Sequence, residues 1–367
     1  MAPISVLVVD DSVVVRRLVS DVLTEDPGIE VVGTASNGKI ALAKIPQLNP
    51  DLITLDIEMP EMDGLETLVE LRKLYPKLPV IMFSTLTERG ATATLDALER
   101  GASDYVTKPA NVGSVAASMQ AVRADLIPKI KSLVVGRHTP APTSLPPAPL
   151  RAATTPHTLS SHSHRVDVVV IGVSTGGPDA LSTVIPQLPG DLPVPVVIVQ
   201  HMPPIFTAMF AKRLDTKSAL HVTEAKPGDR VVAGGVLVAP GDYHLRVRSD
   251  GHGVVAATDQ GTPENYCRPA VDVLFRSAVD VYGANILAVV LTGMGSDGAR
   301  GAARIVEAGG SVIAQDERTS VVWGMPGAVV HAGLASEVLP LASVAGAIHS
   351  RVTRGRSLIG AGREARS

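Results

Sequence analysis

Short aliphatic runs alternate with segments of helical periodicity through the first third of the chain. Residues 4–9 and 52–56 are almost continuously apolar, as in parallel strands that are buried on both faces. Strands are predicted at residues 4–9, 30–33, 52–56, 80–84 and 104–107, and helices at residues 12–24, 39–44, 65–74, 91–100 and 112–127. This strand–helix repeat predicts a flavodoxin-like (βα)5 domain, with a parallel sheet covered by helices on both faces.

A second alternation of strands and helices begins near residue 166. Strands are predicted at residues 166–172, 194–200, 286–291 and 311–314, and helices from residue 178 and at residues 206–214, 272–281 and 299–308. Glycine-rich, strand-like segments at residues 230–239, 243–247 and 253–257 interrupt this alternation, so mixed parallel and antiparallel pairing is expected. The pattern predicts a second, doubly wound and mostly parallel α/β domain.

The segment between the two patterns has a different composition. Residues 137–164 are rich in Pro, Ser, Thr, Ala and His, and no acidic residue lies between Asp125 and Asp167. Such a segment buries too little apolar surface to fold, so we interpret it as a linker. We therefore expect domains at residues 1–123 and 166–355, a linker at residues 124–165 and a disordered tail at residues 356–367.

Composition narrows the class of protein. The 367 residues are 45% apolar and 19% charged, which is typical of a globular chain. The net charge of −3 excludes a strongly basic protein that coats nucleic acid, although not a local basic patch. The single cysteine excludes an internal disulfide. Without a basic signal-peptide start or an apolar run of about 20 residues, the chain is expected to be soluble and cytoplasmic.

Acidic residues directly follow two of the predicted strands in the first half. Asp10 and Asp11 follow the first strand and Asp56 ends the third, and such strand ends meet at one edge of a parallel sheet. Three carboxylates at one place are tolerated when a hard cation such as Mg²⁺ lies among them. Ser84 ends the fourth strand and Lys108 follows the fifth. The set suits phosphoryl transfer to an aspartate, although each acid alone is also typical of a helix cap or a loop.

This half resembles the receiver domain of two-component response regulators. The matching segments are Val8-Val9-Asp10-Asp11-Ser12, Leu55-Asp56-Ile57-Glu58-Met59-Pro60, Asp63-Gly64, Ser84 and Thr107-Lys108-Pro109. The resemblance implies that Asp56 is the phosphoacceptor. It also implies that Asp11, Asp56 and the carbonyl of Glu58 hold Mg²⁺, with Asp10 supporting the metal site. It assigns roles in phosphoryl contact and switching to three residues at strand ends: Ser84, Tyr105 and Lys108.

Polar loops follow three of the aliphatic strands in the second half. Residues 172–178, 200–203 and 292–298 contain Ser174, His201 and Asp297, respectively. If these strands are parallel and adjacent, the three side chains converge at one edge of the sheet. Ser174 is then a nucleophile in a strand-to-helix turn. His201 is its general base, and Asp297 orients the imidazole.

Each of these residues also has a simpler interpretation. The glycine-rich loop around Ser174 is also typical of a phosphate- or dinucleotide-binding turn, although no Walker lysine follows it. A single His201 is typical of a satisfied histidine at a strand end. A single Asp297 is typical of an N-cap for the helix near Ala299.

The three loops together resemble the CheB chemotaxis methylesterase family. The resemblance extends over residues 166–350 and includes the segments 264–272 and 316–326. It implies hydrolysis of γ-glutamyl methyl esters on methyl-accepting chemoreceptors and deamidation of specific receptor glutamines, with no cofactor for the esterase chemistry. It makes the backbone N–H of Met294 a candidate oxyanion donor. Arg268 either positions an acidic receptor helix or forms a surface salt bridge.

The fusion of a receiver to a hydrolase indicates control by phosphorylation. The implied partners are chemoreceptors as substrates and a chemotaxis histidine kinase as phosphodonor, without nucleic acid and without membrane insertion. We hypothesise that the unphosphorylated receiver covers the face that carries Ser174 and that phosphorylation of Asp56 weakens this docking. The alternative is a non-enzymatic response regulator whose second domain binds a nucleotide or a receptor. A DNA-binding regulator is a more distant alternative.

Overall fold

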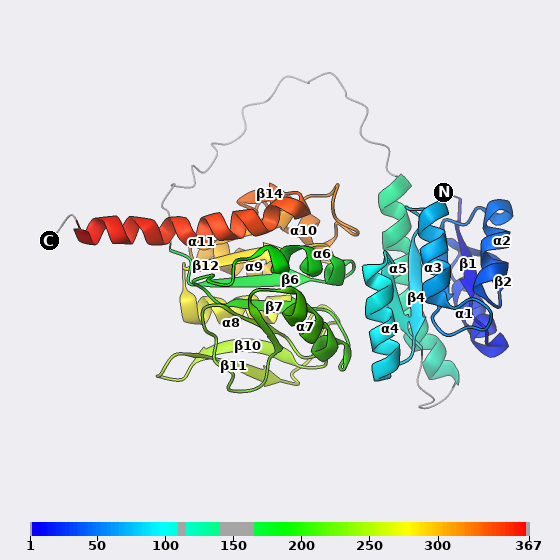
Figure 1. Cartoon of the computed structure of the whole chain (residues 1–367), viewed down its shortest axis with the longest axis horizontal. Helices are drawn as coiled ribbons and strands as arrows, with labels where there is room; N and C mark the ends of the chain where they lie inside the picture. Colours follow the sequence, from blue (N-terminus) through cyan, green and yellow to red (C-terminus); the bar gives the residue numbers. More distant parts are fainter. Residues whose placement is uncertain (1, 109–114, 139–164, 365–367) are drawn as a thin grey trace, which may run out of the picture.

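Two α/β halves follow one another along the chain (Figure 1). The computed structural model describes residues 2–108, 115–138 and 165–364. No helix within these ranges has a stretch that is long and apolar enough to cross a membrane.

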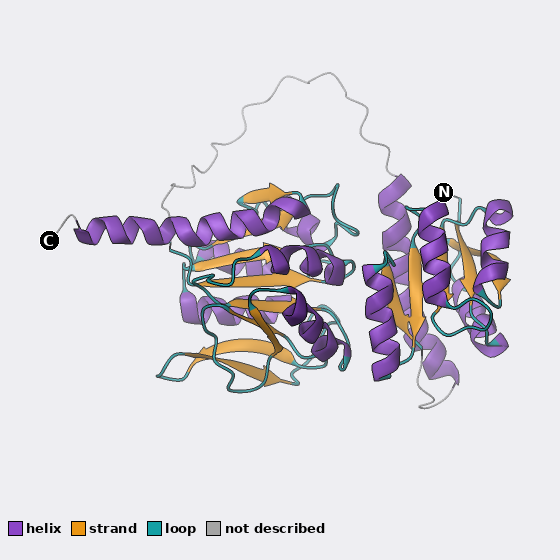
Figure 2. Cartoon of the chain, viewed as in Figure 1, coloured by secondary structure: helices purple, strands orange, loops and turns teal. Residues whose placement is uncertain are grey.

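The first half contains a five-stranded parallel sheet in the order β2-β1-β3-β4-β5. Its strands are β1 (Ile4–Val9), β2 (Ile29–Ala35), β3 (Leu52–Asp56), β4 (Val80–Ser84) and β5 (Asp104–Thr107). Its helices are α1 (Val13–Thr24), α2 (Gly38–Leu48), α3 (Gly64–Leu74), α4 (Glu88–Glu99) and α5 (Val115–His138). Helices cover both faces of the sheet, which confirms the predicted (βα)5 fold (Figure 2).

Alternate residues of β1 explain the two layers of helices. Val6 and Val8 belong to the core cluster that contains residues of α1 and α5, whereas Leu7 and Val9 belong to the cluster that contains residues of α2, α3 and α4. Successive side chains of a strand point to opposite faces, so an uninterrupted apolar run supplies both layers.

Helix α5 is longer than the composition predicts. We expected the linker to begin at residue 124, whereas α5 continues to His138. Leu126, Ile130 and Leu133 on this extension are buried in the core beside the sheet. Their spacing places them on one face of the helix, and burial of that face stabilises helix beyond the expected boundary.

The second half contains a seven-stranded parallel sheet in the order β14-β13-β12-β6-β7-β9-β8. Its strands are β6 (Val168–Val173), β7 (Val196–Gln200), β8 (His221–Glu224), β9 (Gly235–Val238), β12 (Ile286–Val290), β13 (Ser311–Gln315) and β14 (Glu337–Leu339). A separate antiparallel pair, β10 (His244–Ser249) and β11 (Val254–Asp259), confirms the expected mixture of pairings. Strand β7 lies on one side of β6 and β12 lies on the other, so the direction in which successive strands are added to the sheet reverses here. Doubly wound sheets typically bind ligands in the crevice at such a point.

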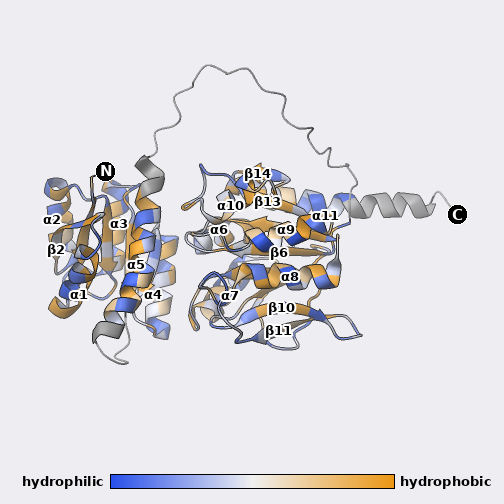
Figure 3. Ribbon diagram, turned by 180° about the vertical axis from the view of Figure 1, so that it is seen from behind, coloured by the Kyte–Doolittle hydropathy of each residue, from blue (hydrophilic) through white to orange (hydrophobic). Residues whose placement is uncertain are grey.

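Helices cover both faces of this second sheet, and its strands are strongly hydrophobic (Figure 3). The helices are α6 (Gly177–Val184), α7 (Phe206–Lys217), α8 (Val271–Tyr282), α9 (Ala299–Glu307), α10 (Met325–His331) and α11 (Leu341–Glu364), with a short 3₁₀ turn η1 (Ile185–Gln187). Buried residues of α6, α7 and α11 share one core cluster, and those of α8, α9 and α10 share another.

The C-terminal region differs from the predicted pattern. The sequence pattern does not predict β14, α10 or α11, and the tail expected at residues 356–367 is helical as far as Glu364. Val344, Ile348 and Val352 on α11 are fully buried at helical spacing. This apolar face anchors the helix to the sheet, and an anchored helix extends at little cost into the residues that follow.

Candidate functional site

The acidic residues predicted at the strand ends of the first half lie together. Ligand oxygens of Asp10, Asp11 and Asp56 all lie within 4.8 Å of one another. Asp10 and Asp56 are buried, and Lys108 Nζ lies 2.9 Å from Asp10 Oδ2 and 2.8 Å from Asp56 Oδ1. Glu58 lines the same pocket as Asp11, but its carboxylate pairs with Arg89 instead of joining the cluster.

The cluster has the donor set of a site for a hard divalent cation. Burial raises the pKa of Asp56 to about 6, although the hydrogen bond from Lys108 opposes this shift. Asp56 Oδ2 is buried and has no hydrogen-bond partner within the described ranges. A buried carboxylate oxygen without a partner, beside two further carboxylates, fits coordination by Mg²⁺.

Ser84 and Tyr105 do not point at the cluster in this conformation. Ser84 is buried at the end of β4, and its Oγ donates to the carbonyl of Gly90 at 3.1 Å, on the first turn of α4. Tyr105 on β5 stacks on Phe206 of the second half, with ring centroids 5.0 Å apart. Ser84 therefore contacts α4, and Tyr105 contacts the second half directly.

The three predicted loops of the second half meet at the switch point of its sheet. Ser174 directly follows β6, His201 directly follows β7, and Asp297 lies in the loop between β12 and α9. Strands β12, β6 and β7 are adjacent and parallel, as the prediction requires. Ser174 and His201 line one cleft with a volume of about 730 Å³.

His201 and Asp297 form a direct pair. His201 Nε2 lies 2.8 Å from Asp297 Oδ2, and only 2% of Asp297 is exposed. Burial raises the pKa of Asp297, but the hydrogen bonds from His201 and from backbone N–H groups outweigh it and lower the pKa below its usual value. The carboxylate is therefore ionised and aligned with the imidazole.

Asp297 does not cap the helix that the sequence suggested. Its carboxylate accepts the backbone N–H groups of Val271 at 2.7 Å and Asp272 at 3.0 Å, at the start of α8. Helix α9, which follows Asp297 in the chain, begins after Gly298 without a side-chain cap. The positive end of the α8 dipole thus stabilises this carboxylate.

The second ring nitrogen of His201 faces a cysteine. Cys267 Sγ lies 3.5 Å from Nδ1, whereas no hydrogen bond within the described ranges joins Ser174 Oγ to His201. Burial lowers the pKa of His201, but Asp297 and Cys267 outweigh it and raise the pKa to about 10. The structure therefore brings His201 and Asp297 together, whereas Ser174 Oγ and His201 are not hydrogen-bonded in this conformation.

Gln200 joins the loop of Ser174 to the loop of His201, a contact that sequence reasoning missed. Its Nε2 donates to the carbonyls of Ser174 and His201, at 3.0 Å each. Gly177 leaves room for this amide, because a Cβ at residue 177 would lie 1.9 Å from Gln200 Oε1. The sequence does place an amide side chain, Gln200, at the end of a buried strand directly before His201, and this could have indicated the contact.

The loop that contains Met294 lies beside Ser174. The N–H of Gly293 donates to Val322 at 2.9 Å, whereas the N–H of Met294 has no acceptor within the described ranges. A Cβ on Gly293 would come within 2.8 Å of Ser174 Cβ, so glycine permits this close approach. The location agrees with a donor aimed at the reacting carbonyl.

Arg268 forms the salt bridge that was one of its two interpretations. Its Nε donates to Asp242 Oδ1 at 3.0 Å, and its Nη1 donates to the carbonyls of Gln260 and Gly261. These partners occupy much of the guanidinium, so the structure favours a role in holding the loop.

The first half covers the cleft of the second half. Thr175 Oγ1, next to the predicted nucleophile, donates to Asp104 Oδ2 of β5 at 2.8 Å. Ser132 Oγ on α5 contacts Met294 Sδ at 3.6 Å. Tyr105, Asp125 and other residues of the first half line the same cleft. In this arrangement the first half therefore forms part of the wall of the cleft that Ser174 lines.

Charged side chains join α4 of the first half to α7 of the second half. Arg213 on α7 pairs with Asp96 at 2.6 Å and Glu99 at 3.5 Å, and it donates to the carbonyl of Thr92 at 2.9 Å. Lys217 pairs with Glu99 at 2.8 Å. Figure 1 shows α4 and α5 of the first half facing α6 and α7 of the second.

Two family models match the chain. The model described as CheB methylesterase matches residues 169–348, which include Ser174, His201 and Asp297. The model described as response regulator receiver domain matches residues 6–120, which include Asp56. The two matches correspond to the two halves of the structure.

Relatives match the chain over nearly its full length. A protein-glutamate methylesterase/protein-glutamine glutaminase from a Nocardioides species is 59% identical over 366 residues, 99% of each chain. A protein of the same description from Trichodesmium erythraeum is 50% identical over 96% of this chain and 100% of its own. The crystal structure of the Thermotoga maritima CheB methylesterase catalytic domain is 45% identical with a TM-score of 0.50, and covers 50% of this chain and 98% of that chain. The chain therefore belongs to the CheB family of protein-glutamate methylesterases/protein-glutamine glutaminases, with a response regulator receiver domain before the methylesterase domain.

Proposed function

We propose that this chain hydrolyses glutamate methyl esters on methyl-accepting chemoreceptors and deamidates specific receptor glutamines. The printed names of its relatives support these two reactions. The observation that carries the proposal is the 2.8 Å contact between His201 Nε2 and Asp297 Oδ2, beside a cleft that Ser174 lines. Both reactions transfer an acyl group from a side-chain carbonyl, so one nucleophile and one base serve both.

Ser174 Oγ attacks the acyl carbon of the ester or amide while His201 Nδ1 accepts its proton. Asp297 accepts the hydrogen bond from Nε2–H, which fixes the tautomer of the ring and stabilises the imidazolium. The N–H of Met294 donates to the oxyanion. His201 then delivers the proton to methanol or ammonia as it leaves, and water hydrolyses the acyl-serine to release glutamate.

A local adjustment of the cleft precedes this attack. His201 Nδ1 now contacts Cys267 Sγ at 3.5 Å, and the receiver holds Thr175, the residue after the nucleophile. Catalytic hydrogen bonds are often completed only when substrate binds. Departure of the receiver and entry of substrate are the events that bring Ser174 to Nδ1.

The receiver supplies the switch. Asp56 accepts the phosphoryl group; Asp11, Asp56 and the carbonyl of Glu58 would hold Mg²⁺, and Asp10 would support the metal site. When bound, Mg²⁺ neutralises charge on the phosphoryl oxygens. Lys108 Nζ, which already lies within 3 Å of both Asp10 and Asp56, contacts the same oxygens.

Ser84 and Tyr105 carry the signal to the interface. Ser84 Oγ now bonds the carbonyl of Gly90, so turning it toward the phosphoryl group releases the start of α4. The Tyr105 ring is stacked on Phe206, so a change of its rotamer breaks a contact between the halves. Phosphorylation adds about −1.5 to −2 charges at Asp56, and this shifts the population toward the undocked arrangement.

We propose that the protein acts in the cytoplasm, where it meets its partners. Its substrates are the methylated helices of chemoreceptors, and its phosphodonor is a chemotaxis histidine kinase. Neither partner requires nucleic acid binding or membrane insertion by this chain.

The function is tested by methanol release from methylated receptor, with and without a small-molecule phosphodonor and Mg²⁺. We expect release by the full chain and faster release with the phosphodonor. Asp56→Asn is expected to keep the basal rate and to lose the stimulation, because it lacks the nucleophilic oxygen that receives the phosphoryl group. Absence of methanol release under both conditions would instead support a non-enzymatic regulator.

Cys267→Ala is expected to move the pH profile of ester hydrolysis to lower pH. Only neutral His201 accepts a proton, so activity rises with pH through the pKa of this group. Cys267 is one of the groups that raise that pKa, so its removal lowers the pH at which activity reaches half of its plateau. The measurement is kcat/KM across pH for both proteins, and an unchanged midpoint would contradict the assigned Cys267–His201 contact.

A further inference from the structure

In the part of the chain that the structure describes, two side chains hydrogen-bond the carboxylate of Asp297. His201 contacts Oδ2, and Asn265 Nδ2 donates to Oδ1 at 2.8 Å. The remaining partners of this carboxylate are backbone N–H groups, which side-chain substitution does not remove. Asn265 is therefore the side chain, apart from the base itself, that sets the orientation of Asp297.

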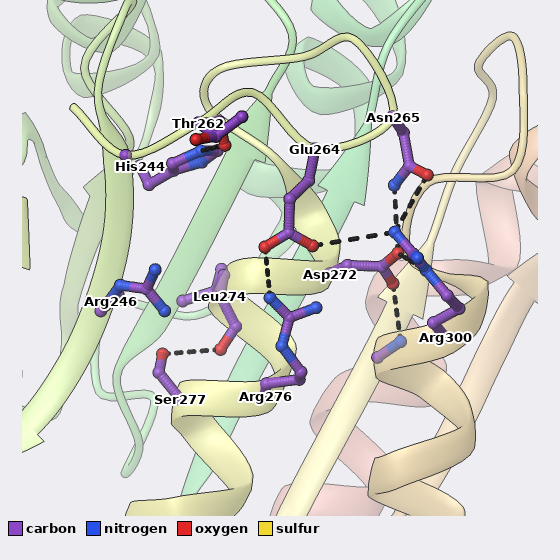
Figure 4. Close-up of polar contacts among 12 residues, drawn as sticks. His244, Arg246, Thr262, Glu264, Asn265, Asp272, Leu274, Arg276, Ser277 and Arg300 are labelled. Carbon is purple, nitrogen blue, oxygen red and sulfur yellow. Dashed lines mark hydrogen bonds and ion pairs between the residues drawn. The ribbon is translucent and has the colours of Figure 1, made fainter. Parts of the chain in front are cut away.

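The Asn265 amide also forms hydrogen bonds with other side chains. Its Nδ2 also donates to Asp272 Oδ2 at 3.1 Å, and its Oδ1 accepts from Arg300 Nη2 at 3.2 Å. Figure 4 shows the amide above Asp272 and Arg300. A flipped amide would turn its oxygen toward two carboxylates and its N–H groups toward a guanidinium, so the hydrogen-bond network permits one orientation. The backbone is left-handed, with φ 52°, a conformation that Asn tolerates better than most residues.

The amide separates two buried carboxylates. Asp272 is fully buried, and Asp297 is 2% exposed. Asp272 is balanced by Arg300 Nε at 3.1 Å and by the N–H of Gly301 at 2.6 Å. Asn265 donates one hydrogen bond to each carboxylate, so it satisfies polar atoms of both buried side chains.

We propose that Asn265 is a positioning residue for ester hydrolysis: it holds the Asp297 carboxylate, and through it the His201 ring, in the orientation that the reaction uses. Asn265 acts through Asp297 and not on the substrate. This inference rests on the proposed function, because it concerns the same reaction. Residues that orient a catalytic group without contacting the substrate typically contribute about 10- to 100-fold to activity.

Two substitutions separate positioning from simple stabilisation. Asn265→Ala removes both hydrogen bonds and adds no charge. Asn265→Asp is isosteric, and when protonated it still donates one hydrogen bond, whereas when ionised it repels both neighbouring carboxylates. The charged groups that face this position are Asp272, Asp297 and Arg300, with Glu264 beside it in the chain and paired with Arg300 and Arg276.

The experiment measures methanol release by the full chain, activated with phosphodonor and Mg²⁺, as kcat and KM across pH. For Asn265→Ala we expect kcat to fall about 10- to 100-fold with KM within about twofold of the wild type, at all pH values. For Asn265→Asp we expect the ratio of its kcat to that of the wild type to fall as pH rises. A merely structural role would not produce this pH-dependent ratio.

Asn285→Ala is the matched control. Asn285 Nδ2 donates to Asp167 Oδ2 at 3.0 Å at the opposite edge of the same sheet, so this variant loses an Asn–Asp hydrogen bond away from the cleft. We expect it to lower the melting temperature without changing kcat or the pH profile. Wild-type kcat in both Asn265 variants, or a raised KM with unchanged kcat, would overturn the proposal. Methanol release by Ser174→Ala at the wild-type rate would overturn the proposed function instead, so the two failures are distinguishable.

Discussion

Ser174→Ala is expected to abolish methanol release, with a loss of about 10⁴- to 10⁶-fold in kcat. The substitution removes the oxygen that forms the acyl-enzyme, and His201 is left with no hydroxyl to activate. Deamidation of receptor glutamines is expected to fall by a similar factor, because both reactions pass through the same acyl-serine. The measurement is methanol and ammonia release with the phosphodonor present, so that docking of the receiver does not limit the rate.

The fold is expected to survive this change. Ser174 Oγ makes no hydrogen bond within the described ranges, whereas the backbone of Ser174 keeps its contacts with Thr292 and Gln200. Ser249→Ala, at the end of β10 and away from the cleft, serves as the control and is expected to retain full activity. Substantial methanol release by Ser174→Ala would show that another group is the nucleophile, and Cys267 would then be the first residue to replace.

Arg213→Glu is expected to raise the methanol-release rate of the unphosphorylated chain about tenfold. Arg213 pairs with Asp96 at 2.6 Å and with Glu99 at 3.5 Å across the two halves, and its side chain is 22% exposed. Reversal of its charge places three carboxylates together between α4 and α7, and such like-charge contacts disfavour association. Each loss of about 1.4 kcal/mol in docking increases the undocked fraction tenfold until that form dominates.

If docking of the receiver inhibits the enzyme, two further results are expected for this variant. The phosphodonor should stimulate Arg213→Glu less than the wild type, because much of the variant is already undocked. A second substitution, Asp96→Arg, should restore low basal activity by re-forming the pair with reversed charges. Arg246→Glu, which breaks the 2.7 Å pair with Asp259 away from the receiver, is the control and should leave the basal rate unchanged. Unchanged basal activity in Arg213→Glu would argue against inhibition by docking.

The acidic cluster shows how much of a site can be predicted from the pattern of strands in the sequence. Asp10, Asp11, Asp56 and Lys108 each lie at the end of a predicted strand, and the structure brings them into one cluster. This succeeds because parallel strands with buried faces are readily recognised, and their carboxyl ends lie at one edge of the sheet. The same argument grouped Ser174, His201 and Asp297 from three loops far apart in the chain.

Side-chain partners inside the cleft escaped the same reasoning. Cys267 and Asn265 come from the loop before α8, not from a predicted strand end, and they reach His201 and Asp297 only through tertiary packing. Asp297 illustrates the converse error, since the nearest helix in sequence suggested a cap for α9, whereas its carboxylate lies at the start of α8. Local sequence does not indicate which helix start is near a carboxylate in space.

The amino-acid sequence by itself determined that the chain forms two α/β domains and which strand ends carry the candidate site residues, because apolar periodicity and strand-end polarity are local properties. Only the tertiary structure decided that α5 continues to His138, which ring nitrogen of His201 faces Asp297, and that Asp104 and Tyr105 of the receiver contact the nucleophile loop and α7. These features depend on contacts between residues far apart in the chain. Their geometry is set when the sheets, helices and domains pack together.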